Sequence, residues 1–89
     1  MGTKMLAQSL SMDLLRVALG LHRGSSTMAK RFKKEALKLC LELEKTQDDK
    51  YILKLAKNSK VALNRNDKNA AEEALMYSIL LQNYALKKL

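Results

Sequence analysis

The chain has 89 residues, 47% of them apolar and 29% charged, a composition that predicts one folded domain over residues 1–89 rather than a disordered chain. Lys and Arg number 17 against 9 Asp and Glu, which gives a formal net charge of +8. The sequence has no proline and only three glycines, so helix is favoured throughout. One cysteine and one histidine exclude an intramolecular disulfide and a structural zinc site. We expect a cytoplasmic protein, because Asp13 and Arg16 interrupt the only stretch resembling an export signal. No cofactor is predicted.

The first predicted helix, residues 5–22, is apolar over more than half of its circumference. One narrow polar stripe runs along it, made of Ser9, Asp13, Arg16 and Gly20. A helix of this kind requires burial on several sides. Its end is predicted by His22 and Arg23, which suit the negative end of the helix dipole, and by Gly24, which can adopt a left-handed turn.

The second and third predicted helices, residues 27–45 and 49–65, are amphipathic and basic on their outer sides. One of the hydroxyl residues at positions 25–27 caps the second helix, and Asp48 and Asp49 suit the start of the third. The inward stripe of the second helix consists of Met28, Phe32, Ala36, Leu39 and Leu43. That of the third consists of Ile52, Leu55, Ala56, Ser59 and Leu63.

The fourth predicted helix, residues 69–88, is uncharged along most of its length. Asn69 and Glu72 have the spacing of a capping box at its start. The longest uncharged run, from Ala74 to Leu86, covers 13 residues. Because a bilayer requires about 20 apolar residues, this run predicts a buried helix rather than a membrane span.

Short connections between these helices predict an all-α fold, a small four-helix bundle of antiparallel helical hairpins. Each helix of such a bundle needs only one buried stripe, so the first and fourth helices carry surplus apolar surface. One explanation is that these two helices are the most buried and are shielded by the middle two. The other explanation is an additional contact with a protein partner or with a second copy of the chain.

The fourth helix supplies the residues that we predict at a partner interface. Two tyrosines seven positions apart share a face with the leucines between them, and the set is Tyr77, Leu80, Leu81 and Tyr84. Ordinary packing within the chain is the alternative for the same residues. The preferred hypothesis is a non-catalytic interaction or assembly module that binds a protein partner or forms a homo-oligomer, with no evident small-molecule substrate.

Positive charge is concentrated in the middle of the chain, where 13 of the 17 basic residues lie between Arg23 and Lys68. If the second and third helices are neighbours, their lysines form one basic face, made of Arg31, Lys34, Lys38, Lys50, Lys54 and Lys57. This face could attract nucleic acid through phosphate contacts, which is the alternative function, or it could simply be a solvated surface. Membrane association is disfavoured because the apolar stripe of the basic second helix is already needed within the bundle.

No catalytic arrangement stands out in the sequence, and the chain is not predicted to be an enzyme. Acid-base or nucleophilic catalysis needs a positioned pair or triad of side chains. The single His22 falls at a helix end, and Cys40 lies beside an inward stripe, which predicts a buried apolar residue. No residues are predicted to bind a metal.

Overall fold

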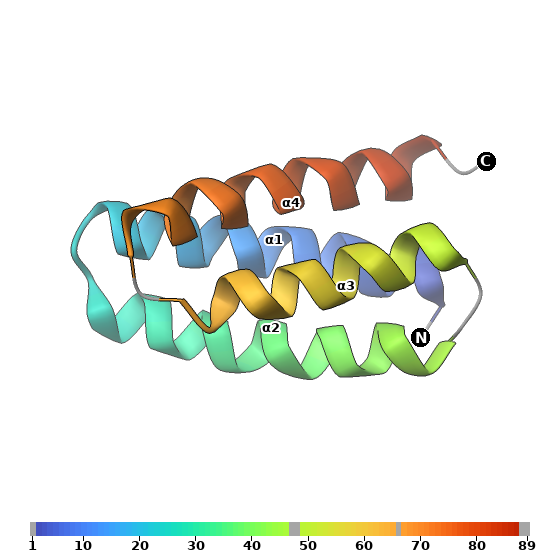
Figure 1. Ribbon diagram of the computed structural model, residues 1–89, viewed down its shortest axis with the longest axis horizontal. Helices are drawn as coiled ribbons and strands as arrows, with labels where there is room; N and C mark the ends of the chain where they lie inside the picture. The colour runs from blue at the N-terminus through green and yellow to red at the C-terminus, as the bar shows by residue number, and fades with distance from the viewer. Residues whose placement is uncertain (1, 47–48, 66, 88–89) are drawn as a thin grey trace.

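The computed structural model describes residues 2–46, 49–65 and 67–87, and four α-helices make up nearly all of them. Their bounds are α1 Thr3–His22, α2 Ser26–Thr46, α3 Lys50–Leu63 and α4 Lys68–Lys87. Successive helices run in opposite directions, so α4 returns beside α1 and the four form one bundle (Figure 1). The predicted four-helix bundle is confirmed, although Asp48 and Lys88, two residues placed at predicted helix ends, lie outside the described residues.

The turn between α1 and α2 ends one helix and starts the next within three residues. Gly24 adopts a positive φ of 72°, and the amide of Ser25 donates to the carbonyl of Gly20 at 2.8 Å, which is a Schellman-type helix end. The hydroxyl of Ser25 then accepts from the amide of Met28 at 3.4 Å and caps α2. The left-handed glycine and the hydroxyl cap both match the predictions.

An aspartate caps the start of α3 and another caps the start of α4. Asp49 Oδ1 accepts from the amide of Tyr51 at 2.8 Å, and Asp67 Oδ1 accepts from the amide of Ala70 at 3.0 Å. The predicted capping box starting at Asn69 is wrong, because α4 begins before that residue and Asp67 already caps it. Asp67 has the further advantage of a negative charge, which the helix dipole favours at this end.

α1 is the most enclosed of the four helices, because its contacts with α4 and with α2 are the two most extensive helix contacts in the bundle. Its buried residues are Leu6, Ala7, Leu10, Ser11, Asp13, Leu14, Val17, Ala18 and Gly20. All five residues of the predicted inward stripe of α3 are buried as well. The expectation of burial on several sides is therefore met in part by α1, where Met5, Met12 and Leu15 are still exposed, and less by α4, where Leu75, Met76 and Ile79 are exposed.

Two close contacts fix how α1 lies against its neighbours. A Cβ atom placed on Gly20 would lie 2.9 Å from the amide nitrogen of Ala29, so the absence of a side chain lets α1 and α2 approach closely. On the other side of α1, the hydroxyl of Ser78 donates a buried hydrogen bond of 2.8 Å to the carbonyl of Ser11. The sides of α1 and α4 that point away from these contacts are left open to solvent.

Candidate interaction surfaces

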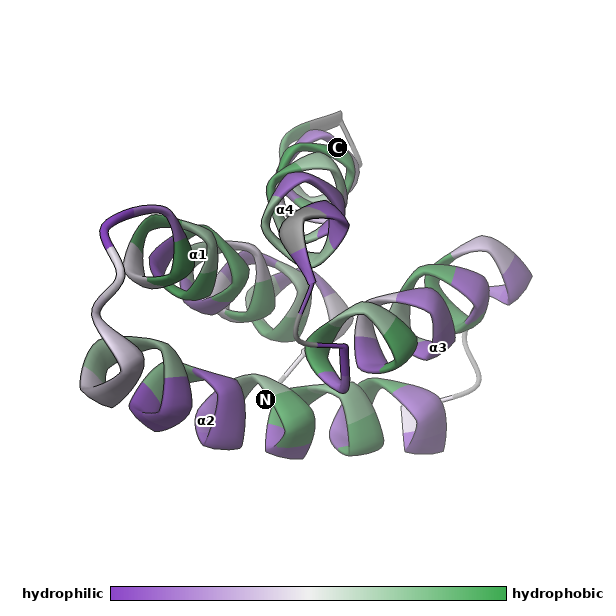
Figure 2. Ribbon diagram, turned by 60° about the vertical axis from the view of Figure 1, so that its left-hand side comes forward, coloured by the Kyte–Doolittle hydropathy of each residue, from purple (hydrophilic) through white to green (hydrophobic). Residues whose placement is uncertain are grey.

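Large apolar side chains are exposed on the outward sides of α1 and α4. We call this surface the apolar face, and its members are Met5, Met12, Leu15, Leu19, Leu75, Met76, Ile79 and Leu86. In Figure 2 the hydrophobic colour predominates on α1 and α4, although each also has hydrophilic segments, and hydrophilic segments recur along α2 and α3. A single exposed leucine is ordinary in a soluble protein, but eight large side chains on two adjacent helices are not.

The register of α1 and α4 joins the exposed side chains of the two helices into one surface. The hydrogen bond from Ser78 to Ser11 fixes this register. Leu15 lies four positions after Ser11, and Leu75 lies three positions before Ser78. Because the helices are antiparallel, Leu15 and Leu75 therefore lie at the same level of the bundle. The apolar face is continuous from one helix to the other.

The four residues predicted at a partner interface lie on a different side of α4. Leu81 is 0% exposed and belongs to the core. Tyr77, Leu80 and Tyr84 are half-buried and pack against the core, and the ring of Tyr84 lies 6.3 Å from that of Tyr51 on α3. The spacing correctly places the four on one face, but that face points into the bundle. The exposed apolar side chains of α4 are instead Leu75, Met76, Ile79 and Leu86.

The six residues of the predicted basic face are all exposed, and they come from adjacent helices. Lys60 Nζ on α3 lies 2.7 Å from Glu44 Oε1 on α2, so the two helices are neighbours. α2 ends at Thr46 and α3 starts back from Lys50, so the α3 members lie opposite the second half of α2. Arg31, Lys34 and Lys38 lie earlier on α2 and are therefore displaced from the α3 members along the bundle. They form an extended basic surface rather than a compact patch.

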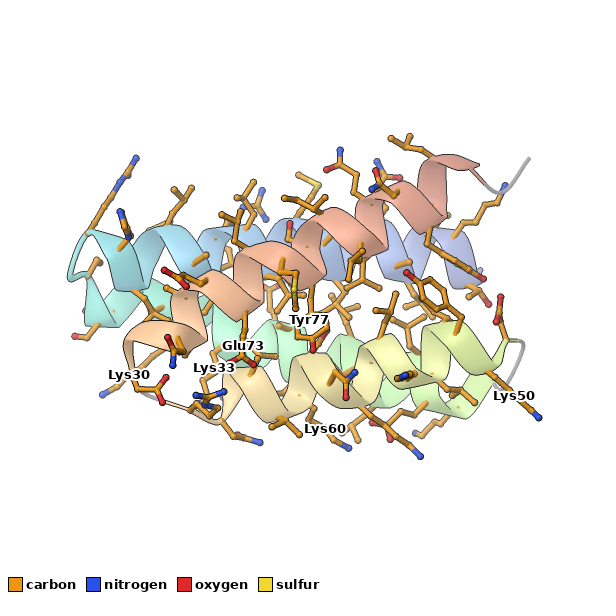
Figure 3. The ribbon with its side chains drawn as sticks, turned by 45° about the horizontal axis from the view of Figure 1, so that its top comes forward. Lys30, Lys33, Lys50, Lys60, Glu73 and Tyr77 are labelled. Carbon is orange, nitrogen blue, oxygen red and sulfur yellow. The ribbon has the colours of Figure 1, made fainter. Side chains whose placement is uncertain are left out.

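Figure 3 shows the same arrangement of charge along the bundle. Lys50 lies at one end, Lys30 and Lys33 lie toward the other end, and Lys60 lies between them. None of the six predicted residues forms an ion pair with any other residue in the described part of the chain. Their charge is available to an anionic partner.

The buried titratable groups are poorly suited to chemistry at neutral pH. Burial, with a smaller contribution from Glu44, raises the pKa of the Cys40 thiol to about 12, so the thiol remains protonated. Burial and the nearby Glu35 raise the pKa of Asp13, while Arg16 at 3.4 Å opposes the shift. Across the described residues, no three His, Cys, Asp or Glu side chains come together as metal ligands would.

Comparison with known proteins gives no family assignment. No protein-family model, curated protein or solved structure matches this chain. None of the described helices is both long enough and apolar enough to cross a membrane. The two exposed surfaces and the interior of the bundle are therefore the features that bear on function.

Proposed function

We propose that this protein is a non-catalytic helical module that binds through its apolar face, and that a second copy of the chain is the simplest occupant of that face. The observation that carries the proposal is the set of eight large, exposed apolar side chains on α1 and α4. Folding does not require them, because the core is already filled from the inner sides of the helices. The buried, unpaired Cys40 is consistent with a reducing compartment such as the cytoplasm.

The extent and charge of the apolar face both support self-association. With roughly half of each side chain exposed, the apolar face presents several hundred Å² of apolar area, a range in which a patch commonly marks an interaction site. The run of α4 from Ala74 to Leu86 contains no charge that would have to be desolvated on binding. Two copies joined through this face would keep their lysines on α2 and α3 pointing away from each other. The net charge of +8 on each copy therefore opposes such a dimer only weakly.

Sedimentation velocity from low micromolar to millimolar concentration tests this proposal. We expect the wild-type protein to sediment as a species heavier than the 10.1 kDa monomer as its concentration rises. Ile79→Glu places a charge in the middle of the apolar face and is expected to restore the monomer. Lys54→Glu also changes an exposed residue, but on α3, and should leave assembly intact. A wild-type protein that is monomeric over the whole range would contradict self-association.

A second candidate function is nucleic-acid binding through the exposed residues of the basic face, none of which forms an ion pair with another described residue. Lysine favours contact with phosphate over recognition of bases, so such binding would be independent of sequence and steeply dependent on salt. Fluorescence anisotropy with a generic duplex at about 50 mM salt measures it under favourable conditions. Charge reversal at Lys50, Lys54 and Lys57 should abolish binding, whereas Ile79→Glu should preserve it. No binding by the wild-type protein at this salt concentration would exclude this function.

A further inference from the structure

A pocket of about 200 Å³ opens at the end of the bundle where α1 and α3 finish and α2 and α4 begin. All four helices contribute to its wall. Its apolar lining consists of Val17, Leu21, Ala29, Ala62, Leu63, Ala70 and Ala74. This pocket is separate from the apolar face, with which it shares no residue. It does not depend on the function proposed above.

Alanines keep this end of the bundle open. Ala29, Ala62, Ala70 and Ala74 come from three different helices, and all four are buried. All four line the pocket, whereas the core elsewhere is filled by larger side chains such as Leu10, Leu43 and Leu81. The interior of the pocket is therefore apolar, with room for a ligand group and no buried charge.

Polar side chains surround the apolar interior of the pocket. Lys30, Lys33 and Arg65 contribute positive charge to its lining. Arg65 is already engaged, since it forms ion pairs with Asp67 at 2.9 Å and with Glu73. Neither lysine forms an ion pair with another described residue. These three cations and two carboxylates leave one positive charge in excess.

The start of α2 adds to the preference of this rim for an anion. Figure 3 places Lys30 and Lys33 at the same end of the bundle as Glu73, which holds Arg65. Ser26 also lines the pocket, and the first turn of α2 that begins there contains no carboxylate. The backbone dipole of α2 is therefore not neutralised at this point and supports the two lysines.

We propose that this pocket binds a small monoanion with a short apolar tail, such as a carboxylate of about six carbons. The carboxylate would lie at Lys30 and Lys33, and the tail would occupy the space left by the alanines. The volume fits this class of ligand, because an engineered apolar cavity of about 150 Å³ is sufficient for benzene. A few convergent polar groups around an apolar interior are the usual composition of a small-molecule site.

Titration of the full chain with hexanoate, followed by amide chemical shifts, tests the proposal. We expect saturable shifts concentrated at the amides of Val17, Ala29, Ala62 and Ala74. Hexan-1-ol has a similar tail without the charge and should bind about tenfold more weakly, the ratio expected for a hydrogen bond to a charged group. Acetate lacks the tail, and hexylamine has the opposite charge, so neither should produce the same shifts. Equal affinity for hexanoate and hexan-1-ol would overturn the proposal, as would shifts confined to the apolar face.

Two variants and a matched control assign the binding to this pocket. Ala62→Leu fills the interior and should abolish hexanoate binding, and Ala70→Leu serves the same purpose if the first variant does not fold, as judged by circular dichroism. Lys33→Gln should weaken binding roughly tenfold. Lys54→Gln removes the same charge from the outer side of α3 and should leave affinity unchanged. Hexanoate binding that survives both a folded pocket-filling variant and Lys33→Gln would overturn the proposal.

Discussion

The outward sides of α1 and α4 are exposed like those of α2 and α3, but their chemistry is different. On α1 and α4, Leu15 and Ile79 face solvent and are 40% and 51% exposed. On α2 and α3, Lys34 and Lys54 face solvent instead. The inward sides of all four helices are apolar, as the bundle requires. The outward sides of α2 and α3 are mainly charged, and their exposed large apolar side chains are Leu41, Tyr51 and Val61. The outward sides of α1 and α4 carry the eight side chains of the apolar face, which the bundle itself does not require. The apolar face is the part of the molecule that folding leaves unexplained.

The sharpest test of this comparison uses two neighbouring leucines of α1. Leu14 is 0% exposed and Leu15 is 40% exposed, so they lie on the inner and outer sides of the same helix. We expect Leu14→Ala to lower the free energy of unfolding by about 2–5 kcal/mol and Leu15→Ala by less than about 1 kcal/mol. Urea denaturation at low micromolar concentration measures both. A comparable loss in both variants would mean that Leu15 is covered even in dilute solution.

The close contact between α1 and α2 gives the next largest expected effect on stability. In Gly20→Ala, the new Cβ atom would meet the backbone of Ala29 at 2.9 Å and force α1 away from α2. We expect a net destabilisation of about 1–2 kcal/mol, because the strain of overpacking exceeds the gain in helix propensity. Gly2→Ala is the matched control, since nothing lies within 4 Å of its Cβ position. A thermal unfolding midpoint that rises in Gly20→Ala would contradict this close approach.

A smaller effect concerns Asp13, the buried carboxylate on α1. Burial raises its pKa above the ordinary value of 3.8, so its contribution to stability is fully present below that pH and is lost as the pH rises through the folded-state pKa. Asp13→Asn should therefore be more stable than the wild-type protein at pH 7 and equally stable at pH 3. Urea midpoints at the two pH values provide the measurement, with the exposed Glu72→Gln as control. If the wild-type protein is more stable than Asp13→Asn at pH 7, the ion pair with Arg16 outweighs the cost of burying the carboxylate.

Local patterns in the sequence were sufficient to predict most of the fold. The inward stripe of α3, from Ile52 to Leu63, was predictable because lysines mark the opposite sides of the helix. Gly24 was identifiable because few other residues adopt a left-handed conformation without strain. Asp67 and Asn69 are both good capping residues two positions apart, so pattern alone did not decide between them.

The surfaces were harder to predict than the fold, for a physical reason. In α4 the run from Ala74 to Leu86 contains no charge, so hydrophobicity alone does not show which side faces the core. The buried Leu81 and the exposed Ile79 are equally apolar in the sequence. The pocket was harder still to predict, because Ala29, Ala62 and Ala74 come together only when all four helices are packed.

The hydrogen bond between Ser78 and Ser11 joins residues 67 positions apart and has a consequence for the order in which the protein is made. During translation α1 can pair with α2 as soon as that helix has emerged from the ribosome. The side of α1 that receives α4 stays uncovered until Lys68–Lys87 has been synthesised. In a nascent chain, α1 therefore exposes this buried side together with its share of the apolar face. We expect incomplete chains that end before α4 to be the species most in need of a chaperone.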